Sequence, residues 1–145
     1  MPTKKFLFDK LGRDNAPELI EASGGKLKYH VVANDDEFLD AVTQKVVEEL
    51  EEVFESQSKQ EVIEELGDLE EILATFKKLI GVTQEEIDAA RTAKREKKGA
   101  FEKRIYCEYA EVEEGSDDDI YLSKQPEKYP QIEKEIESEE ELFGE

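Results

Sequence analysis

Two neighbouring segments with helical periodicity, residues 35–56 and 58–80, constrain this chain more than any other feature. Each residue of a helix advances by roughly 100°, and at that step the apolar side chains of each segment share one face. Only the polar stretch SQSKQ joins the segments, which predicts an all-α fold built on an antiparallel helical hairpin. The apolar positions are Phe38, Leu39, Val42, Val46, Leu50 and Val53, then Val62, Leu66, Leu69, Ile72, Leu73, Phe76, Leu79 and Ile80.

Signals for helix ends support this expectation. Asn34, Ser58 and Thr83 each stand three residues before a glutamate, which is the pattern of a capping box. The three helices that they open are expected to end at about Ser56, before Gly81 and at Gly99. The third helix is expected to direct Ile87 and Ala90 inward, completing a helical bundle.

Four carboxylates fall on or beside the apolar faces of the hairpin. Glu49 and Glu65 fall within these faces, whereas Glu52 and Asp68 lie at their edges, with Lys45 as a marginal cation. Ionised carboxylates are rarely buried unless they are paired or bind a metal, and a hard divalent cation such as Mg²⁺ is the simplest neutraliser. In the other interpretation, the two glutamates extend to the margins of the apolar faces and the other two residues are surface charges.

The same residues carry a family resemblance. Glu48-Glu49-x-x-Glu52 followed by Glu65-x-x-Asp68 resembles the EExxE...ExxD signature of the MazG-like all-α nucleoside triphosphate pyrophosphohydrolases, a group that includes phosphoribosyl-ATP pyrophosphatase and the dimeric dUTPases. The stretch KLGRDNAPELIEASG (residues 10–24) is similar to the KLVRDKIPEII segment of one MazG-like branch, and KREKKGAFEKRIYCE (residues 94–108) to its KRxxRGGFEKRI segment. The resemblance covers roughly residues 5–108 in matching order.

The resemblance implies metal-dependent hydrolysis of a nucleoside triphosphate to the monophosphate and pyrophosphate. It assigns Glu49, Glu52, Glu65 and Asp68 as ligands of one or two Mg²⁺ ions, with Mn²⁺ as an alternative, and Glu48 and Glu49 as catalytic residues. Such an ion neutralises phosphate oxygens and activates a water for attack on phosphorus. Two alternatives stay open: phosphoribosyl-ATP hydrolysis within the same family, and a non-catalytic acidic helical adaptor that binds basic partners. The preferred base does not follow from the sequence.

Basic residues are the expected contacts of the substrate phosphates. Residues 91–104 hold seven basic residues against two acidic ones, although the chain has a net charge of -19. Cations at the end of a helix also complement its dipole, but their number here exceeds what capping needs. The resemblance singles out Arg95, Lys98 and Lys103 as substrate-binding residues, together with the pair Arg13 and Asp14, which alternatively form a local cap and salt bridge.

The amino-terminal part is expected to combine a short helix with extended chain. Asp14 or Asn15 can cap a helix that carries Pro17 in its first turn and ends at Gly24. Residues 26–32 alternate weakly, as a short strand or an extended link would. The apolar residues of positions 4–11 are expected to tie the terminus to the core; they are Phe6, Leu7, Phe8 and Leu11.

Composition and charge divide the chain after residue 110. The resemblance implies a MazG-like domain over residues 1–110, and an acidic, largely flexible tail is expected over residues 111–145. The tail has 14 acidic and 3 basic residues and allows a short helix over residues 131–142. The negative charge argues against nucleic-acid binding, and the absence of a long apolar run argues against a signal peptide or membrane span. We therefore expect a cytoplasmic protein, and a homodimer or higher homo-oligomer, because one short third helix cannot cover both apolar faces.

Two single residues are weaker candidates for chemistry. Cys107 is alone in the chain and lies in an alternating stretch, so it is expected to be a small buried hydrophobic residue. His30, the single histidine, lacks a partner of the kind that a catalytic constellation needs and is expected to be structural.

Overall fold

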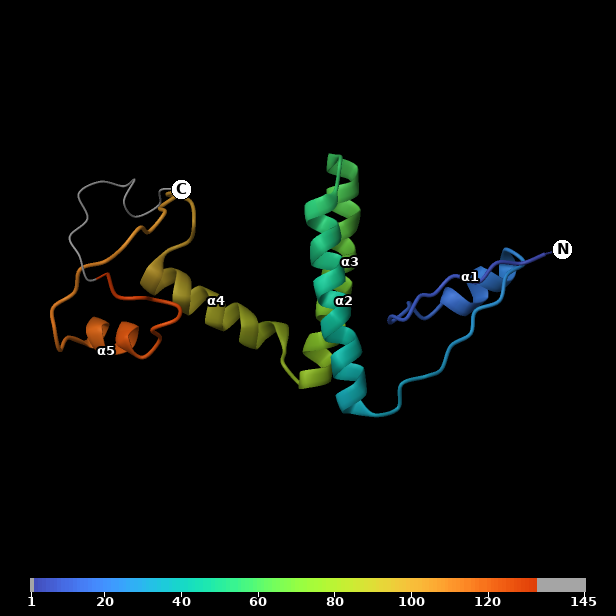
Figure 1. Cartoon of the computed structure of the whole chain (residues 1–145), viewed down its shortest axis with the longest axis horizontal. Helices are drawn as coiled ribbons and strands as arrows, with labels where there is room; N and C mark the ends of the chain where they lie inside the picture. Colours follow the sequence, from blue (N-terminus) through green and yellow to red (C-terminus); the bar gives the residue numbers. More distant parts are fainter. Residues whose placement is uncertain (1, 133–145) are drawn as a thin grey trace. The chain divides into compact units, whose positions relative to one another are not determined.

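The computed structural model describes residues 2–132, and within this range it contains helices and no strand (Figure 1). The predicted all-α class is therefore confirmed. By its internal contacts the chain divides into two units, Met1–Gly99 and Ala100–Glu145. A domain boundary after residue 110 stays a prediction. The helices are α1 (Ala16–Ala22), α2 (Asp35–Glu55), α3 (Lys59–Ile80), α4 (Gln84–Lys98) and α5 (Asp117–Ser123).

The antiparallel pair of α2 and α3 is the centre of the first unit (Figure 1). Among the described helices, these two are the pair that pack against each other. The predicted hairpin is thus present, but α4 does not add a third layer to it. Ile87 of α4 is only half-buried and Ala90 is exposed, so the expectation that both point inward is wrong for Ala90. A helix that packs against no other helix has nothing to bury its apolar residues against.

The core of the hairpin is narrow. Val42 is fully buried and Ile72 is 9% exposed, and both belong to the predicted apolar faces. The margins of the same faces remain open to solvent: Leu50 is 41% exposed, Leu66 44% and Ile80 46%. Two helices bury only the strip along which they touch, whereas each apolar face here is wider than that strip. The margins therefore need a further layer that these two helices do not supply.

Side-chain caps set the helix starts, as the sequence predicts. The Asn34 Oδ1 accepts hydrogen bonds from the backbone N–H groups of Asp36 (2.8 Å) and Glu37 (3.1 Å) at the start of α2. Ser58 and Thr83 cap α3 and α4 in the same way, through bonds of 3.2 and 3.1 Å. Gly81 ends α3 with a left-handed backbone (φ 75°), a conformation that glycine adopts without steric cost.

Replacing Asn34 with alanine is expected to lower the free energy of unfolding by about 1 kcal/mol, because two amide groups of α2 lose their acceptor. Asn15 is the matched control, since it occupies the N-cap position of α1 without a side-chain capping bond. Asn15→Ala should therefore change stability little. Thermal and urea unfolding of the two variants measure the difference, and equal losses would show that the Asn34 cap does not stabilise α2.

Three of the four amino-terminal apolar residues, Phe6, Leu7 and Phe8, remain exposed, contrary to expectation, whereas Leu11 is half-buried. Phe6 is 76% exposed, Leu7 91% and Phe8 55%, because no helix or strand of the described chain packs over them. The predicted short helix is present as α1, with Pro17 in its first turn. Residues 25–34 have no regular secondary structure, so this segment is an extended link and not a strand.

The second unit contains a helix that the sequence interpretation missed. Ser116 caps α5 by accepting from the Asp119 N–H (3.2 Å), while the Asp119 carboxylate accepts from the Gly115 N–H (2.7 Å). The motif Ser-x-x-Asp at 116–119 was the available signal. Cys107 is exposed and not buried, because its alternating stretch forms no strand. The helix considered for residues 131–142 lies, beyond residue 132, outside the described residues.

Candidate metal centre

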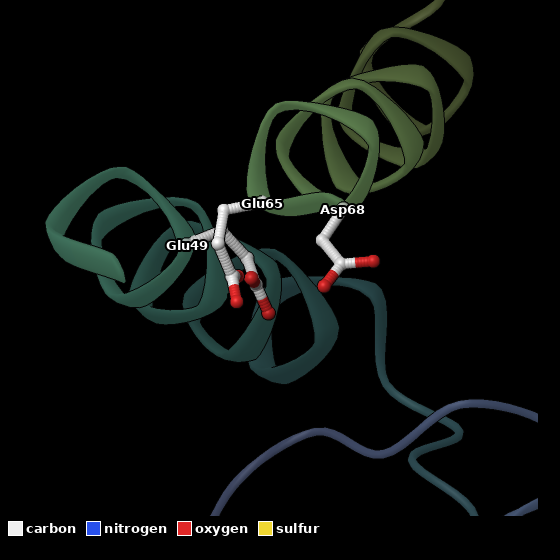
Figure 2. A group of neighbouring side chains, drawn as sticks. All are labelled: Glu49, Glu65 and Asp68. Atoms are coloured by element: carbon white, nitrogen blue, oxygen red, sulfur yellow. The ribbon is translucent and has the colours of Figure 1, made fainter. Parts of the chain in front are cut away.

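Three carboxylates from the two long helices converge on one point of the hairpin. Glu49 of α2 and Glu65 and Asp68 of α3 each offer an oxygen, and these oxygens all lie within 4.8 Å of one another. Figure 2 shows the three side chains extending into the same space from their two ribbons. Glu49 and Glu65 each lie eight residues from Gln57 in the connection between the helices. In an antiparallel pair, residues equally distant from the turn lie at the same height, which explains the convergence.

Burial distinguishes this group from an ordinary set of surface acids. Glu49 is only 6% exposed, although it is charged in its ordinary state. Its Oε2 atom and the Oε2 atom of Glu65 are buried and have no hydrogen-bond partner in the structure. Buried polar atoms without a partner are destabilising. A cation bound between them would satisfy both, and carboxylate oxygens are the ligands that Mg²⁺ prefers. The group formed by Glu49, Glu65 and Asp68 can therefore hold a metal ion.

A lysine partly compensates the charge of this group. The Lys45 Nζ lies 3.2 Å from the Glu49 Oε1 and 3.5 Å from the Glu48 Oε2, one helical turn away on α2. Burial nevertheless raises the pKa of the Glu49 carboxyl, and Lys45 only opposes this effect. The lysine thus neutralises one oxygen of Glu49 and leaves the other unpartnered.

Glu52 lies beside the three-residue group without belonging to it by distance. Its carboxyl is half-buried, and its pKa is raised first by burial and then by the neighbouring Glu65 carboxyl. The structure brings three of the four predicted metal ligands, Glu49, Glu65 and Asp68, within 4.8 Å of one another. The role of Glu52 as a fourth ligand stays a prediction.

Glu48 has a different environment from Glu49. Its carboxylate accepts a hydrogen bond from the Lys10 ammonium (2.8 Å) and also faces Lys45. The hydrogen bond from Lys10 lowers the pKa of the Glu48 carboxyl, so the group stays charged. A carboxylate held in this way is a weak acceptor of protons, and it suits the orientation of Lys45 and Glu49 better than proton abstraction. The predicted catalytic role of Glu48 stays a prediction.

The predicted substrate-binding residues are only partly brought together. The Arg13 Nη2 lies 2.7 Å from the Asp68 Oδ1, so one of them reaches the cluster. Its neighbour Asp14 is exposed, and no hydrogen bond or ion pair of Asp14 is found within residues 2–132. Arg95 and Lys98 are exposed on α4, which packs against no other described helix, and Lys103 is exposed in the second unit. The contact of α4 with α3 is a hydrogen bond from the Lys77 Nζ to the Gln84 Oε1 (2.9 Å). Sequence reasoning overlooked Lys10, although it lies three residues before Arg13.

Comparison with family models, with curated proteins and with solved structures finds no match to this chain. None of the helices within residues 2–132 combines the length and the apolar character that crossing a lipid bilayer requires.

Proposed function

We propose that this protein hydrolyses a nucleoside triphosphate to the monophosphate and pyrophosphate with Mg²⁺ or Mn²⁺, as a member of the MazG-like group. The observation that carries the proposal is the pair of buried, unpartnered carboxylate oxygens on Glu49 and Glu65, contributed by two different helices. Neither oxygen accepts a hydrogen bond from any residue of the described range 2–132, and a hard cation satisfies both. The signature residues from 48 to 68 and the flanking KLGRD and FEKRI stretches support the choice of reaction.

In this proposal, Glu49, Glu65 and Asp68 hold the cation and Glu52 lies beside them as a fourth ligand. When bound, the metal supplies neutralisation of phosphate oxygens and acidification of a water molecule. Lys45 holds one oxygen of Glu49, so that the other oxygen stays directed into the group. Arg13, Asp14, Arg95, Lys98 and Lys103 are proposed to contact the substrate, Arg13 as the one found at the cluster.

A panel of canonical, deoxy and damaged nucleoside triphosphates, with phosphoribosyl-ATP included, tests the proposal. We expect pyrophosphate release from at least one of them with Mg²⁺ or Mn²⁺ and none with a chelator. The nucleotide that reacts also decides between triphosphate and phosphoribosyl-ATP hydrolysis. Release from no member of the panel, with no Mg²⁺ or Mn²⁺ binding, would reject the enzyme and favour a non-catalytic acidic adaptor.

We further propose that a second copy of the chain covers the open apolar margin of the hairpin. Side chains along α2 and α3 are exposed to a degree that is unusual for large hydrophobic groups gathered on one element. They include Val47 (51%), Leu50 (41%), Phe54 (78%), Ile63 (52%) and Leu66 (44%). Covering them with the same surface of a partner gives the self-complementary interface of a dimer.

Light scattering after size exclusion is expected to give the mass of a dimer or larger oligomer at micromolar concentration. Phe54→Ser should weaken the assembly, because the exposed ring would be buried against the partner. Phe101 is the control, since it is 98% exposed and lies in the second unit; Phe101→Ser should leave the mass unchanged. A monomeric parent protein would contradict the proposal.

A further inference from the structure

The segment that precedes α1, here called the amino-terminal arm (residues 2–15), reaches the metal centre through two charged contacts. The Lys10 Nζ donates to the Glu48 Oε1 at 2.8 Å, and an Arg13 nitrogen donates to the Asp68 Oδ1 at 2.7 Å. One contact lies on α2 and the other on α3, so the arm touches both helices that build the centre. Asp9, directly before Lys10, has a left-handed backbone (φ 45°), which is uncommon outside glycine and bends the arm here.

Apart from the half-buried Leu11, little besides these ion pairs holds the arm in place. The apolar residues of positions 6–8 are all more than half exposed, and α1 packs against no other described helix. The side chains of Lys10 and Arg13 are themselves 46% and 65% exposed. Exposed ion pairs of this kind change an equilibrium by about fivefold at most. The arm is therefore attached weakly enough for a competing ion to displace it.

The partners of the two cations are the reason to expect competition. Asp68 belongs to the group that can hold a metal, so Arg13 and the metal attract the same carboxylate. Glu48 directly precedes Glu49, another member of that group. A divalent ion bound there lowers the negative potential that attracts Lys10 and Arg13. The two cations are then available to another anion at the same place.

The incoming anion in the proposed reaction is a polyphosphate. Five carboxylates line this region, against Lys45 as the cation contributed by the hairpin itself near Glu49. A polyanion that approaches such a surface is repelled unless cations are bound to it or are already present at the surface. An ammonium offers a point charge and a guanidinium offers a planar fork, and both are suited to phosphate oxygens. The carboxylates concerned are Glu48, Glu49, Glu52, Glu65 and Asp68.

We propose that Lys10 and Arg13 form a phosphate-binding pair, which exchanges its carboxylate partners Glu48 and Asp68 for the phosphate oxygens of the substrate when metal binds. The inference rests on the proposed function and deepens it, because it adds Lys10 to the site and gives both cations a second partner. The arm then acts as a positioning element for the polyphosphate. A purely structural arm would keep its two carboxylate contacts in every state.

If the proposal is correct, removing the charge of Lys10 or Arg13 changes the affinity for metal and the affinity for phosphate in opposite directions. Lys10→Gln and Arg13→Gln remove a competitor of the metal, so the affinity for Mn²⁺ alone should stay equal or rise by about two- to fivefold. The same variants lose a charged hydrogen bond to phosphate, so inorganic tripolyphosphate should bind at least about tenfold more weakly in the presence of Mn²⁺. Arg13→Lys should fall between the parent and Arg13→Gln, because it keeps the charge without the fork.

Isothermal titration calorimetry of the full chain measures both affinities. Lys5→Gln is the matched control, because it removes the same charge from the same arm without touching either ion pair. Lys5→Gln should stay within about twofold of the parent for both ligands. Values for Lys10→Gln and Arg13→Gln that equal those of the control would overturn the proposal. So would weaker Mn²⁺ binding together with a lower melting temperature, which would make the arm a structural tie.

The outcome also separates this inference from the proposed function. A parent protein that binds Mn²⁺ and tripolyphosphate through Lys10 and Arg13 but releases no pyrophosphate from any nucleotide would reject hydrolysis and leave the phosphate-binding pair intact. A parent protein that hydrolyses nucleotides while both variants bind tripolyphosphate normally would reject the pair alone. Absence of Mn²⁺ and tripolyphosphate binding in the parent would overturn both.

Discussion

Replacing Glu65 with glutamine is expected to lower Mg²⁺-dependent pyrophosphate release by at least about 100-fold, since even residues behind metal ligands cost about 10- to 100-fold when changed. The substitution keeps the size of the side chain and removes the charge that a cation needs. Without metal, the variant should melt at the same temperature as the parent or higher, because a half-buried carboxylate with a buried, unpartnered oxygen has been removed from a group of like charges. Added Mg²⁺ should raise the melting temperature of the parent but not of the variant.

Glu71→Gln is the control for this experiment, because Glu71 is an exposed residue of the same helix. It should show parental hydrolysis and the parental response to Mg²⁺. A Glu65→Gln protein that melts lower without metal and still hydrolyses nucleotide normally would contradict the metal centre. That result would instead make Glu65 a structural residue stabilised by a nearby cation.

Replacing Val42 with aspartate is expected to unfold the hairpin. Val42 is the one described side chain that is fully buried, and a charge placed there has no partner. We expect a loss of about 3 kcal/mol or more in the free energy of unfolding, which is a large part of the total stability of a domain with so narrow a core. Far-ultraviolet circular dichroism and thermal unfolding measure the loss of α2 and α3.

Val31→Asp is the corresponding control, because it makes the same change at a residue that is 83% exposed. It should keep the parental helix content and melting temperature. If Val42→Asp also melted like the parent, Val42 would not lie in a core and the packing of α2 on α3 would be wrong. Both variants should be compared without added metal, so that ligand binding does not compensate for lost stability.

The helix boundaries could be predicted because their causes are local. Asn34, Ser58 and Thr83 cap the helices that begin immediately after them, and each bond spans only two or three residues. Ser116 caps α5 in the same way, but its Ser-x-x-Asp motif lies in a stretch so rich in acidic residues that it does not stand out. The weak alternation of residues 26–32 allowed a short strand that is not formed, because the cause of a strand is not local. A strand needs a neighbour to pair with, and none is present among the described residues.

The inward position of Glu49 was also predictable, because helical periodicity places it among apolar residues and the structure leaves it only 6% exposed. Its convergence with Glu65 and Asp68 follows once the short connection makes α2 and α3 antiparallel. The exposure of Cys107 and of the amino-terminal residues Phe6, Leu7 and Phe8 could not be predicted in this way. An apolar pattern marks a surface that can be buried, but burial needs a second element to cover it.

The sequence by itself determined the helical class, the ends of the long helices and the face on which the acidic residues of the hairpin lie, because these features depend on neighbours within one or two helical turns. Only the tertiary structure decided that the arm brings Lys10 to Glu48 and Arg13 to Asp68, across separations of 38 and 55 residues. It also decided that α4, with its basic residues, packs against no other described helix. Contacts between distant segments depend on the path of the whole chain, and periodicity within a single helix carries no information about that path.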